Sequence, residues 1–405
     1  MLSVEEAIQR IERSFSPLGA ELVSLDQALG RVLAEPLEAR LTQPPADVSA
    51  MDGYAVRNDD VETLPARLKI TQRIAAGQQP SGAIGAGEAA RIFTGAQVPP
   101  GADTIVIQEN CDEADGQVTV REGNRRLGQH IRKAGLDFAT GDIALHSGRR
   151  LTARDVSLAA AMNRPWLKVT RRPRIALLST GDELVNPGDP VGPAQIIGSN
   201  GIGLAALVRA FGGEPVNLGI ARDTLEDLDR AIEAALGFDA LVTSGGTSVG
   251  EHDLVQTALA KRGMQLDFWK IAMRPGKPLM FGTLGTLRVL GLPGNPVSTI
   301  VTALLFLKPA IDRMLGLSGV DPARQVALLG KDMPANDTRQ DYVRARLVTN
   351  ADGQRVATPF APQDSSMLSL IARADCLIVR KPNAPAAKAG DIIDVIPLSG
   401  GCLSI

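Results

Sequence analysis

The stretch Ile175-Ala-Leu-Leu-Ser-Thr-Gly-Asp-Glu183 decides the fold class, because a short buried run ends in a polar loop that contains glycine. Three further runs have the same apolar character, at residues 216–221, 239–243 and 288–290. Helical patterns lie between or after them, at about 200–211, 224–236, 252–262 and 296–313. Strands that alternate with helices predict a parallel sheet covered by helices on both faces.

The first 35 residues predict two helices. In the first, the apolar positions from Val4 to Phe15 fall on one face, and Ser3 with Glu6 has the spacing of a capping box. Apolar residues between 25 and 33 repeat the pattern behind Ser24 and predict the second helix. The chain therefore opens with a helical segment.

The character of the sequence changes from about residue 42 to residue 144. Short β-branched runs separated by Gly/Pro turns occur there, at 68–70, 90–93, 104–107 and 118–120. A helical pattern returns near Thr152. This order of helix, β-rich segment and helix predicts a β domain inserted into a discontinuous first domain.

A second β-rich segment follows residue 319, where the helical patterns stop. Its predicted strands lie at 324–329, 342–348, 355–358, 376–379 and 392–396 and indicate a small terminal barrel or sandwich. The predicted fold class is thus multidomain α/β plus β, with a parallel-sheet α/β core domain. Its predicted parts are a discontinuous helical domain (1–45 plus 146–172), an inserted β domain (46–145), the α/β domain (173–320) and a C-terminal β-barrel-like domain (321–405).

Composition excludes several classes of protein. A length of 405 residues favours two to four domains, and 44% hydrophobic with 22% charged residues is ordinary for globular chains. A net charge of −2 with 3% aromatic residues argues against nucleic-acid binding. The three cysteines are far apart, which argues against a disulfide framework or a zinc site. No secretory signal or membrane span is evident, so we expect a cytoplasmic protein.

Three motifs resemble known signatures but lack their context. Residues 246–250 match the G-x-S-x-G nucleophile elbow, yet the last histidine is His252, so no downstream imidazole can complete that triad. Residues 201–206 resemble a dinucleotide fingerprint, but a long polar loop separates them from the preceding strand. Residues 274–278 lack the first glycine and the Ser/Thr of a P-loop. A serine hydrolase, an NAD enzyme and a P-loop protein are therefore disfavoured.

Polar loops follow four predicted strands, and the carboxyl ends of parallel strands are where ligands bind. The loop residues that we expect to offer hydroxyl and backbone N–H groups to a phosphate are Ser179, Thr180 and Gly181, and Ser244, Gly245, Gly246, Thr247 and Ser248. Any one loop is explained as well by turn and cap residues. Four loops that converge on one sheet edge favour a binding crevice.

Charged residues lie near these loops. The carboxylates Asp182, Glu183, Asp223, Glu251 and Asp253 suit Mg²⁺, although scattered surface acids explain each of them separately. The basic residues Lys270, Arg274 and Lys277 cluster in an apolar, proline-rich segment, which fits an anion pocket better than a solvated face.

The same loops belong to a longer series of segments. They are SAMDGYA at 49–55, FTGA at 93–96, GQHIR at 128–132 with Asp137, STGDEL at 179–184, TSGGTSVGE at 243–251 with Asp253, WKIAM at 269–273, PGKP at 275–278 and LPGNPVS at 292–298. As a set and in this order they closely resemble the molybdopterin molybdenumtransferases, the MoeA family, whose eukaryotic relative forms the end domain of gephyrin. The resemblance covers essentially the whole chain.

The resemblance implies a transferase of molybdenum cofactor biosynthesis. The family takes adenylylated molybdopterin and molybdate and releases AMP and Mo-molybdopterin in a Mg²⁺-dependent reaction. It also implies a four-domain homodimer, with the active cleft between the α/β domain of one subunit and the β-insert of its partner. A molybdopterin adenylyltransferase and maturation factors of apo-molybdoenzymes are the partners that it implies.

Site residues follow from the resemblance position by position. The expected catalytic residues are Asp52, Glu183, Asp223, Lys270 and Lys277, and the expected Mg²⁺ ligands are Glu183, Asp223 and Asp253. Besides the two phosphate loops, the expected binding residues are Thr94, Asp137, Arg274, Pro293, Pro296, Arg344 and Ser365. Two positions depart from the family pattern, since Arg274 stands where lysine is usual and Gln363-Asp-Ser365 stands where the family has Gln-Gly-Ser.

Two other functions remain open from the sequence. A molybdopterin adenylyltransferase has a similar α/β domain with the Thr-Ser-Gly-Gly-Thr loop, but the extra β domains and the segment at 49–55 favour molybdenum insertion. A non-catalytic pterin-binding scaffold is disfavoured because the candidate acids and most basic positions are retained. Molybdate and tungstate are not distinguished, since both are tetrahedral dianions of nearly equal size.

Overall fold

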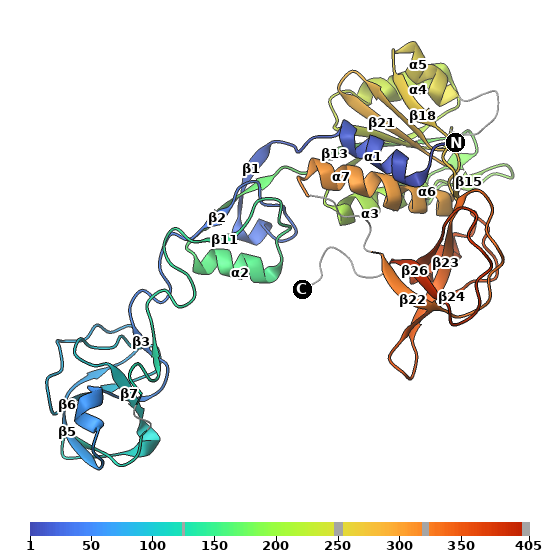
Figure 1. Cartoon of the computed structure of the whole chain (residues 1–405). Coiled ribbons are helices and arrows are strands. Elements are labelled where there is room, and N and C mark those ends of the chain that lie inside the picture. The colour runs from blue at the N-terminus through green and yellow to red at the C-terminus, as the bar shows by residue number, and fades with distance from the viewer. Residues whose placement is uncertain (124–125, 247–253, 318–323, 399–405) are drawn as a thin grey trace. The chain divides into compact units, whose positions relative to one another are not determined.

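The computed structural model describes residues 1–123, 126–246, 254–317 and 324–398 of the chain (Figure 1). Two compact units result: residues 1–35, 147–154 and 166–405 form the first, and residues 36–146 and 155–165 form the second. Because the chain leaves the first unit and returns to it, the β-rich second unit is an insertion. The exact four-domain boundaries that the sequence suggests stay a prediction.

The first unit contains a six-stranded sheet with the order β16-β13-β17-β21-β20-β18. Its strands are β13 (Arg174–Thr180), β16 (Glu214–Ala221), β17 (Ala240–Ser244), β18 (Gln265–Trp269), β20 (Met280–Leu284) and β21 (Leu287–Leu292). The four predicted strands pair in parallel, as expected, whereas β20 and β18 add an antiparallel edge. The sheet is therefore mixed, with its parallel part in one block. A short parallel pair, β14 (Leu184–Val185) and β15 (Ile196–Ile197), lies outside it.

Helices cover both faces of this sheet, as the sequence predicts. They are α3 (Asn200–Phe211), α4 (Leu225–Ala235), α5 (Leu254–Lys261), α6 (Pro296–Thr302), the π-helical turn η4 (Ala303–Leu307) and α7 (Lys308–Met314). Side chains alternate along a strand, so β13 sends Ile175 and Leu177 into one hydrophobic cluster and Ala176 and Leu178 into another. The first cluster includes α3, α6 and α7, and the second includes α4 and α5.

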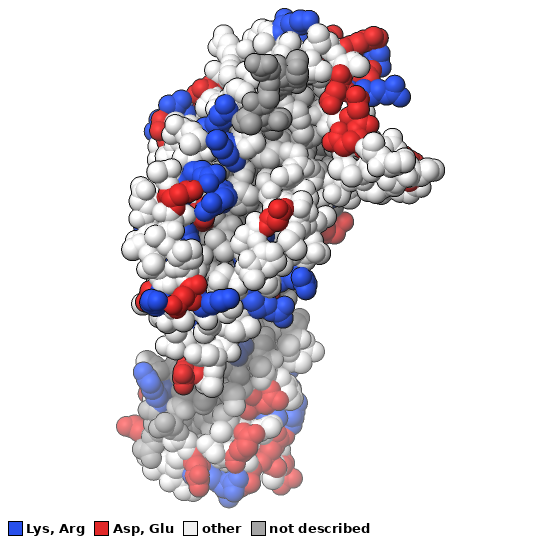
Figure 2. Space-filling model, turned by 90° about the vertical axis from the view of Figure 1, so that its right-hand side faces the viewer, with Lys and Arg blue, Asp and Glu red and all other residues white. Residues whose placement is uncertain are grey.

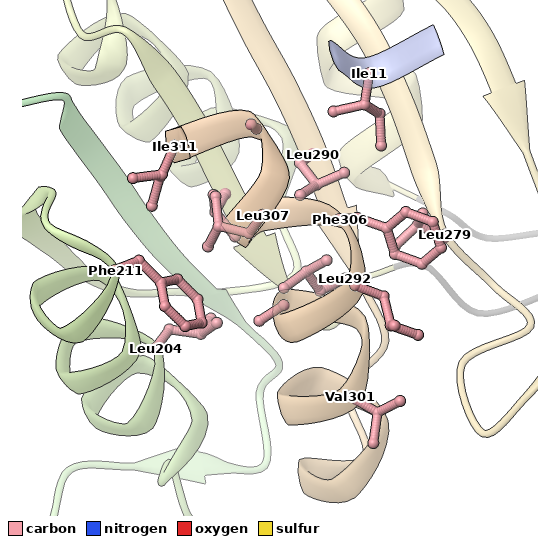
Figure 3. Packing of buried hydrophobic residues seen from close by; sticks show 14 of the residues in the cluster. Ile11, Leu204, Phe211, Leu279, Leu290, Leu292, Val301, Phe306, Leu307 and Ile311 are labelled. Carbon is pink, nitrogen blue, oxygen red and sulfur yellow. The ribbon is translucent and has the colours of Figure 1, made fainter. Parts of the chain in front are cut away.

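The N-terminal helix α1 (Val4–Ser14) belongs to the first cluster through Val4, Ala7 and Ile11. The Ser3 side chain accepts a hydrogen bond from the Glu6 backbone N–H and caps the helix, as its spacing predicts. Figure 3 shows this core from close by, with Phe306 of η4 beside Leu279 and with Ile11 on the neighbouring helix. Helix α1 is thus fixed to the α/β domain by burial of its apolar face.

The prediction of a second N-terminal helix at 25–33 was wrong. The chain instead forms β1 (Ala20–Ser24) and a single 3₁₀ turn, η1 (Leu25–Gln27). Strand β1 pairs antiparallel with β12 (Trp166–Thr170), and Leu33 bridges to Val169 of the same strand. Pairing with a segment more than a hundred residues away overrides the local helical periodicity, because the paired strands satisfy the backbone groups that a helix would otherwise satisfy.

The C-terminal domain is a closed small barrel. Its strands are β22 (Gln325–Leu329), β23 (Gln340–Thr349), β24 (Arg355–Pro359), β25 (Cys376–Arg380) and β26 (Ile392–Pro397). They pair in the cycle β23–β24–β22–β26–β25 and back to β23, so the ring closes, as the predicted barrel requires. The sequence prediction missed one short helix, α8 (Leu368–Ala372). Strand β19 (Met273–Arg274) joins this sheet in parallel with the start of β23.

The second unit is built on a six-stranded sheet with the order β7-β4-β6-β5-β9-β8. Its strands are β4 (Gly53–Val56), β5 (Ala66–Ile74), β6 (Glu88–Ile92), β7 (Thr104–Ile107), β8 (Cys111–Ala114) and β9 (Gln117–Val120). Tyr54 and Ala55 point into separate hydrophobic clusters, so both faces of β4 are buried.

Smaller elements complete the second unit. They are β2 (Leu37–Glu38) paired with β11 (Ile143–Leu145), β3 (Val48–Ser49) paired with β10 (Ile131–Arg132), the 3₁₀ turns η2 (Asn58–Val61) and η3 (Gln108–Asn110), and the helix α2 (Ala153–Ala161). Helix α2 confirms the helix predicted near Thr152.

The distribution of charge on the surface and the length of the helices agree with the composition. Figure 2 shows basic and acidic side chains interspersed on the face in view, in keeping with a net charge of −2. Among the described residues no helix is long and apolar enough to cross a membrane.

Truncation of Phe306 to alanine should destabilise the α/β domain by about 3–5 kcal/mol, because the ring is fully buried between the sheet and α1. Chemical denaturation followed by tryptophan fluorescence would measure the loss. The matched control is Leu22→Ala, whose side chain is 69% exposed and whose truncation should change stability by less than about 0.5 kcal/mol. Equal losses in the two variants would contradict the packing described.

Candidate active site

The candidate site lies at the carboxyl edge of the parallel strands. Strand register sets Ser179 opposite Ser244 and Ser244 opposite Leu292, so β13, β17 and β21 end side by side. The Asn200 amide ties this edge together, donating to the Ser244 Oγ at 2.9 Å and to the Gly294 carbonyl at 2.7 Å. The loops that follow the three strands are therefore held at one place.

A cavity of about 830 Å³ opens at this edge. Ten of the predicted residues line it: Thr180, Gly181, Glu183, Asp223, Gly245, Gly246, Arg274, Lys277, Pro293 and Ser365. Ser179 and Ser244 are buried in the strand ends instead, and Lys270 and Pro296 do not line the cavity. Thr247, Ser248, Glu251 and Asp253 lie outside the described residues. The structure thus brings together predicted residues from six separate segments of the chain.

The glycine pair after β17 allows a close approach of two backbones. A Cβ at Gly245 would lie 2.5 Å from the Thr180 carbonyl oxygen, and one at Gly246 would lie 2.3 Å from a Val255 methyl group. Both glycines also have positive φ, at 95° and 65°. Beside them the Thr180 hydroxyl is buried and has no hydrogen-bond partner among the described residues. The two glycines thus let this loop pack against Thr180 at the wall of the cavity.

Two carboxylates, Glu183 and Asp223, line the cavity from different loops. Asp182 precedes Glu183 in the chain, and its Oδ1 accepts a hydrogen bond from the Asp223 backbone N–H at 3.1 Å. Burial raises the pKa of Asp223, and repulsion from Asp182 and Glu183 raises it further. A divalent cation would relieve this repulsion, so the two acids fit a Mg²⁺ site. The part of the chain that the structure describes holds no cluster of three or more His, Cys, Asp or Glu ligands, and Asp253 lies outside it.

The three predicted basic residues differ in their surroundings. Lys277 lines the cavity and forms no ion pair with the described part of the chain. Lys270 has a left-handed backbone with φ at 89°, and its Nζ lies 4.3 Å from the centroid of the Trp269 ring. Arg274 forms a two-pronged ion pair with Asp341 of the barrel, in which its Nε donates to Oδ1 at 2.8 Å. Of the three, Lys277 is the one with a free charge at the cavity.

Arg344 of β23 is buried, with 1% of its surface exposed, yet its Nε and Nη2 have no hydrogen-bond partner in the part of the chain that the structure describes. Burial lowers the pKa of Arg344, and the negative charge of Asp364 opposes this effect. The side chain borders a second cavity, of about 520 Å³, which shares Arg274, Pro275 and Gln363 with the first. An unpaired buried guanidinium is costly, and an anionic ligand would remove that cost.

A short loop of the barrel connects Arg344 to the α/β domain. The Gln363 side chain accepts a hydrogen bond from the Arg344 backbone N–H at 3.0 Å and donates to the Arg344 carbonyl at 3.1 Å. Two residues later, the Ser365 Oγ accepts from the Asn295 amide at 2.8 Å, and the Val297 N–H donates to the Ser365 carbonyl at 3.1 Å. Ser365 is thus held at the edge of the sheet.

Several lining residues were not predicted from the sequence, among them Asn295, Ser298, Arg339 and Gln363. Asn295 and Ser298 belong to the LPGNPVS segment, and that segment was the signal for them. Arg339 carries no comparable signal, because its position depends on the pairing of β19 with β23.

The second unit contains the other predicted residues. Asp52 accepts hydrogen bonds from the Thr94 backbone N–H at 2.8 Å and from the Thr94 hydroxyl at 2.7 Å. These two bonds, and then the charge of Arg91, lower the pKa of Asp52. Asp137 borders a separate cavity of about 510 Å³, together with Arg132. Asp52 and Thr94 therefore form one pair, while Asp137 lies in a different pocket of the same unit.

The fold and the site define a class: a modular protein in which an α/β domain and a small barrel together line a pocket suited to an anionic ligand. Three family models match the chain. They are the MoeA N-terminal region (domain I and II) at residues 2–163, the probable molybdopterin binding domain at 176–313 and the MoeA C-terminal region (domain IV) at 326–398.

Relatives match over nearly the whole length. The chain is 33% identical over 403 residues to the molybdopterin molybdenumtransferase of Haemophilus influenzae, covering 98% of this chain and 99% of that protein. It is 39% identical over 332 residues to the molybdopterin molybdenumtransferase of Nostoc sp., covering 80% and 76%. It is also similar to the solved structure of the molybdopterin biosynthesis moea protein from Pyrococcus horikosii, with a TM-score of 0.85, 30% identity and coverage of 99% and 100%. The chain belongs to the molybdopterin molybdenumtransferases, the MoeA family.

Replacement of Thr94 by valine should raise the pKa of Asp52 towards its usual value, because one of its two hydrogen bonds is lost while the backbone bond remains. Ionised Asp52 stabilises the fold at pH values above its pKa in the unfolded chain, and this stabilisation is lost as the pH falls through the lower pKa of the folded state. The variant should therefore lose the stabilisation at a higher pH. A ¹³C NMR titration of the carboxyl resonance between about pH 2 and 6 measures the shift. An unchanged titration would contradict the role of the hydroxyl.

Proposed function

We propose that the chain inserts molybdate into adenylylated molybdopterin, with release of AMP and Mo-molybdopterin, in a Mg²⁺-dependent reaction. As a molybdopterin molybdenumtransferase it is an enzyme of molybdenum cofactor biosynthesis that transfers molybdenum. The observation that carries the finer proposal is the buried Arg344, which lines the second cavity and has two side-chain nitrogens without a hydrogen-bond partner among the described residues.

Molybdate is a tetrahedral dianion, and three groups of the chain suit it. Arg344 offers two buried N–H donors without competing partners. Lys277 supplies a free positive charge at the first cavity, and Ser365 supplies a hydroxyl fixed by Asn295. Charge-assisted hydrogen bonds from such donors are the stronger class of hydrogen bond, and a site of low water content strengthens them further.

The first cavity suits the larger substrate. Its volume of about 830 Å³ lies in the range of about 300–1,000 Å³ that is usual for small-molecule and cofactor sites. The loops at Thr180 and at Gly245 would receive the phosphate groups with backbone N–H and hydroxyl donors. The sulfurs that capture molybdenum belong to the pterin substrate, so this reaction needs no protein thiol.

The acids have separate tasks in this proposal. Glu183 and Asp223 would hold Mg²⁺, with Asp253 as a third ligand from outside the described residues. A bound Mg²⁺ supplies polarisation of the phosphoanhydride that is to be cleaved. Asp52 is ionised and has a lowered pKa, which makes it a poor proton acceptor and favours a role in positioning charge. Lys270 and Asp137 stay candidate residues on the strength of the resemblance alone.

The location of the protein in the cell, its oligomeric state and its partner proteins are also proposals. We expect a cytoplasmic homodimer that receives its pterin from a molybdopterin adenylyltransferase and passes the product to maturation factors of apo-molybdoenzymes. These expectations follow from the resemblance of the SAMDGYA, STGDEL and LPGNPVS segments to the family.

The proposal is tested by AMP release from adenylylated molybdopterin, with and without molybdate and Mg²⁺, coupled to reactivation of an apo-molybdoenzyme. Release that needs both ions and leads to reactivation is the expected result. Tight pterin binding without release would instead identify a scaffold, and ATP-dependent formation of the adenylate would identify an adenylyltransferase.

Replacement of Arg344 by methionine should reduce molybdate-dependent AMP release by roughly 10²-fold, because the anion loses its buried donors. The variant should keep or gain thermal stability, since an unpaired buried charge is replaced by an apolar side chain of similar length. Activity assays and thermal unfolding together distinguish lost anion binding from lost folding. Full activity in the folded variant would exclude Arg344 from the anion site.

Replacement of Glu183 by glutamine should lower turnover at limiting Mg²⁺ by about 10- to 100-fold, with partial recovery when more Mg²⁺ is supplied. A Mg²⁺ titration of AMP release measures this effect. The control is Cys111→Ser, which should leave turnover nearly unchanged, because burial raises the pKa of the Cys111 thiol to about 11 and keeps it protonated at neutral pH. A Mg²⁺ dependence identical to that of the unmodified chain would remove Glu183 from the metal site.

A further inference from the structure

Asp364 is an additional negative charge beside the proposed anion pocket, at the position where the family pattern has glycine. Its side chain lines the first cavity, between Gln363 and Ser365. Its Oδ1 accepts hydrogen bonds from the Ser366 backbone N–H at 2.8 Å and from the Ser366 hydroxyl at 2.6 Å. These bonds lower the pKa of Asp364, so the carboxylate is ionised at neutral pH and is held in place by its own loop.

The loop places this charge close to Arg344 without pairing the two groups. Gln363 is fastened to both backbone groups of Arg344, and Asp364 is the next residue along the chain. The two charges attract each other, yet no described residue accepts a hydrogen bond from the Arg344 Nε or Nη2. Asp364 therefore changes the potential at the guanidinium but leaves its donors free for a ligand.

The influence of Asp364 on a bound anion depends on the other charged residues that line the two cavities. Arg274 is already balanced by Asp341 and approached by Asp337 at 3.6 Å, so it adds little net positive charge to the pocket. Arg339 of the first cavity is likewise paired with Asp337, so Lys277, Lys331 and Arg344 are the lining cations that form no ion pair with the described residues. Glu183 and Asp223 also line the first cavity, but Asp364 is the carboxylate next to Gln363, which is bonded to Arg344, and its charge acts on that guanidinium.

We propose that Asp364 sets the affinity and charge selectivity of the anion pocket, by repelling a doubly charged oxyanion more strongly than a singly charged one. This inference rests on the proposed function, since it concerns the molybdate site of that reaction. Coulomb energy is proportional to the charge of the ligand, so the effect on a dianion should be twice, on a logarithmic scale, the effect on a monoanion of the same shape.

The test compares molybdate with perrhenate, a tetrahedral oxyanion of similar size with a single charge. Asp364→Asn is the main variant, because the asparagine Oδ1 can accept the same two hydrogen bonds from Ser366 while the charge is removed. Asp364→Gly also removes the charge, and it introduces the residue that is usual in the family. Asp352→Asn is the matched control, since it removes the same charge from an exposed hairpin turn that borders neither cavity.

Dissociation constants of both anions are measured by calorimetry on the full-length chain at low salt, where surface charges are least screened. Both Asp364 variants should bind molybdate roughly five-fold more tightly and perrhenate roughly two-fold more tightly, and the KM for molybdate should fall in parallel. Asp352→Asn should change neither constant. Unchanged molybdate affinity in both Asp364 variants would overturn the inference, and so would equal changes for the two anions, which would indicate a steric effect.

Failure of the inference is distinguishable from failure of the proposed function. If the unmodified chain binds no molybdate and releases no AMP, the proposed function fails and the inference falls with it. If the unmodified chain binds molybdate, Arg344→Met abolishes that binding and the Asp364 variants match the unmodified chain, the inference alone is overturned.

Discussion

The register between β13, β17 and β21 is the constraint on which the rest of the structure depends. It sets Ser179, Ser244 and Leu292 in one row, so three loops begin at the same edge of the sheet. Thr180, Gly245 and the loop after Leu292 can then enclose a common cavity. The register is itself maintained by burial on both faces, since a slip of one residue would exchange the side chains of the two hydrophobic clusters.

The barrel completes the site because it is joined to that edge at three points. Strand β19 pairs with β23, Arg274 pairs with Asp341, and the Asn295 amide donates to Ser365. These contacts bring Arg344 and the 363–366 loop to the pocket from a domain that follows the sheet in sequence. The departure from lysine at Arg274 is understandable in these terms, since a planar guanidinium can make the two-pronged contact with Asp341 that a lysine ammonium cannot. Arg274 thus serves to attach the barrel to the α/β domain.

Sequence patterns predicted the α/β elements and helix α1 well and the segment at 25–33 poorly, for one physical reason. Strands such as β13 and β17 are buried on both faces, so each appears as a short apolar run between turns. The segment at 25–33 has helical periodicity as well, yet neighbouring β1 and Leu33 pair with β12. Helix α8 was missed because it is a single short turn of helix in a loop, held by packing of Leu370 and Ile371. Local patterns fail where a distant strand or a tertiary contact supplies the stabilisation.

The sequence by itself determined the class of fold, the family and the set of glycines, acids and basic residues, because these depend on periodicity and on chemistry carried by single residues. Only the tertiary structure decided which charges are available. Arg274 and Arg344 are both arginines near the pocket, but the first is paired with Asp341, whereas the second is buried with two nitrogens that no described residue contacts by a hydrogen bond. Pairing and burial are properties of positions brought together across the chain, and the cost of an unpaired buried charge arises only once water has been excluded around it.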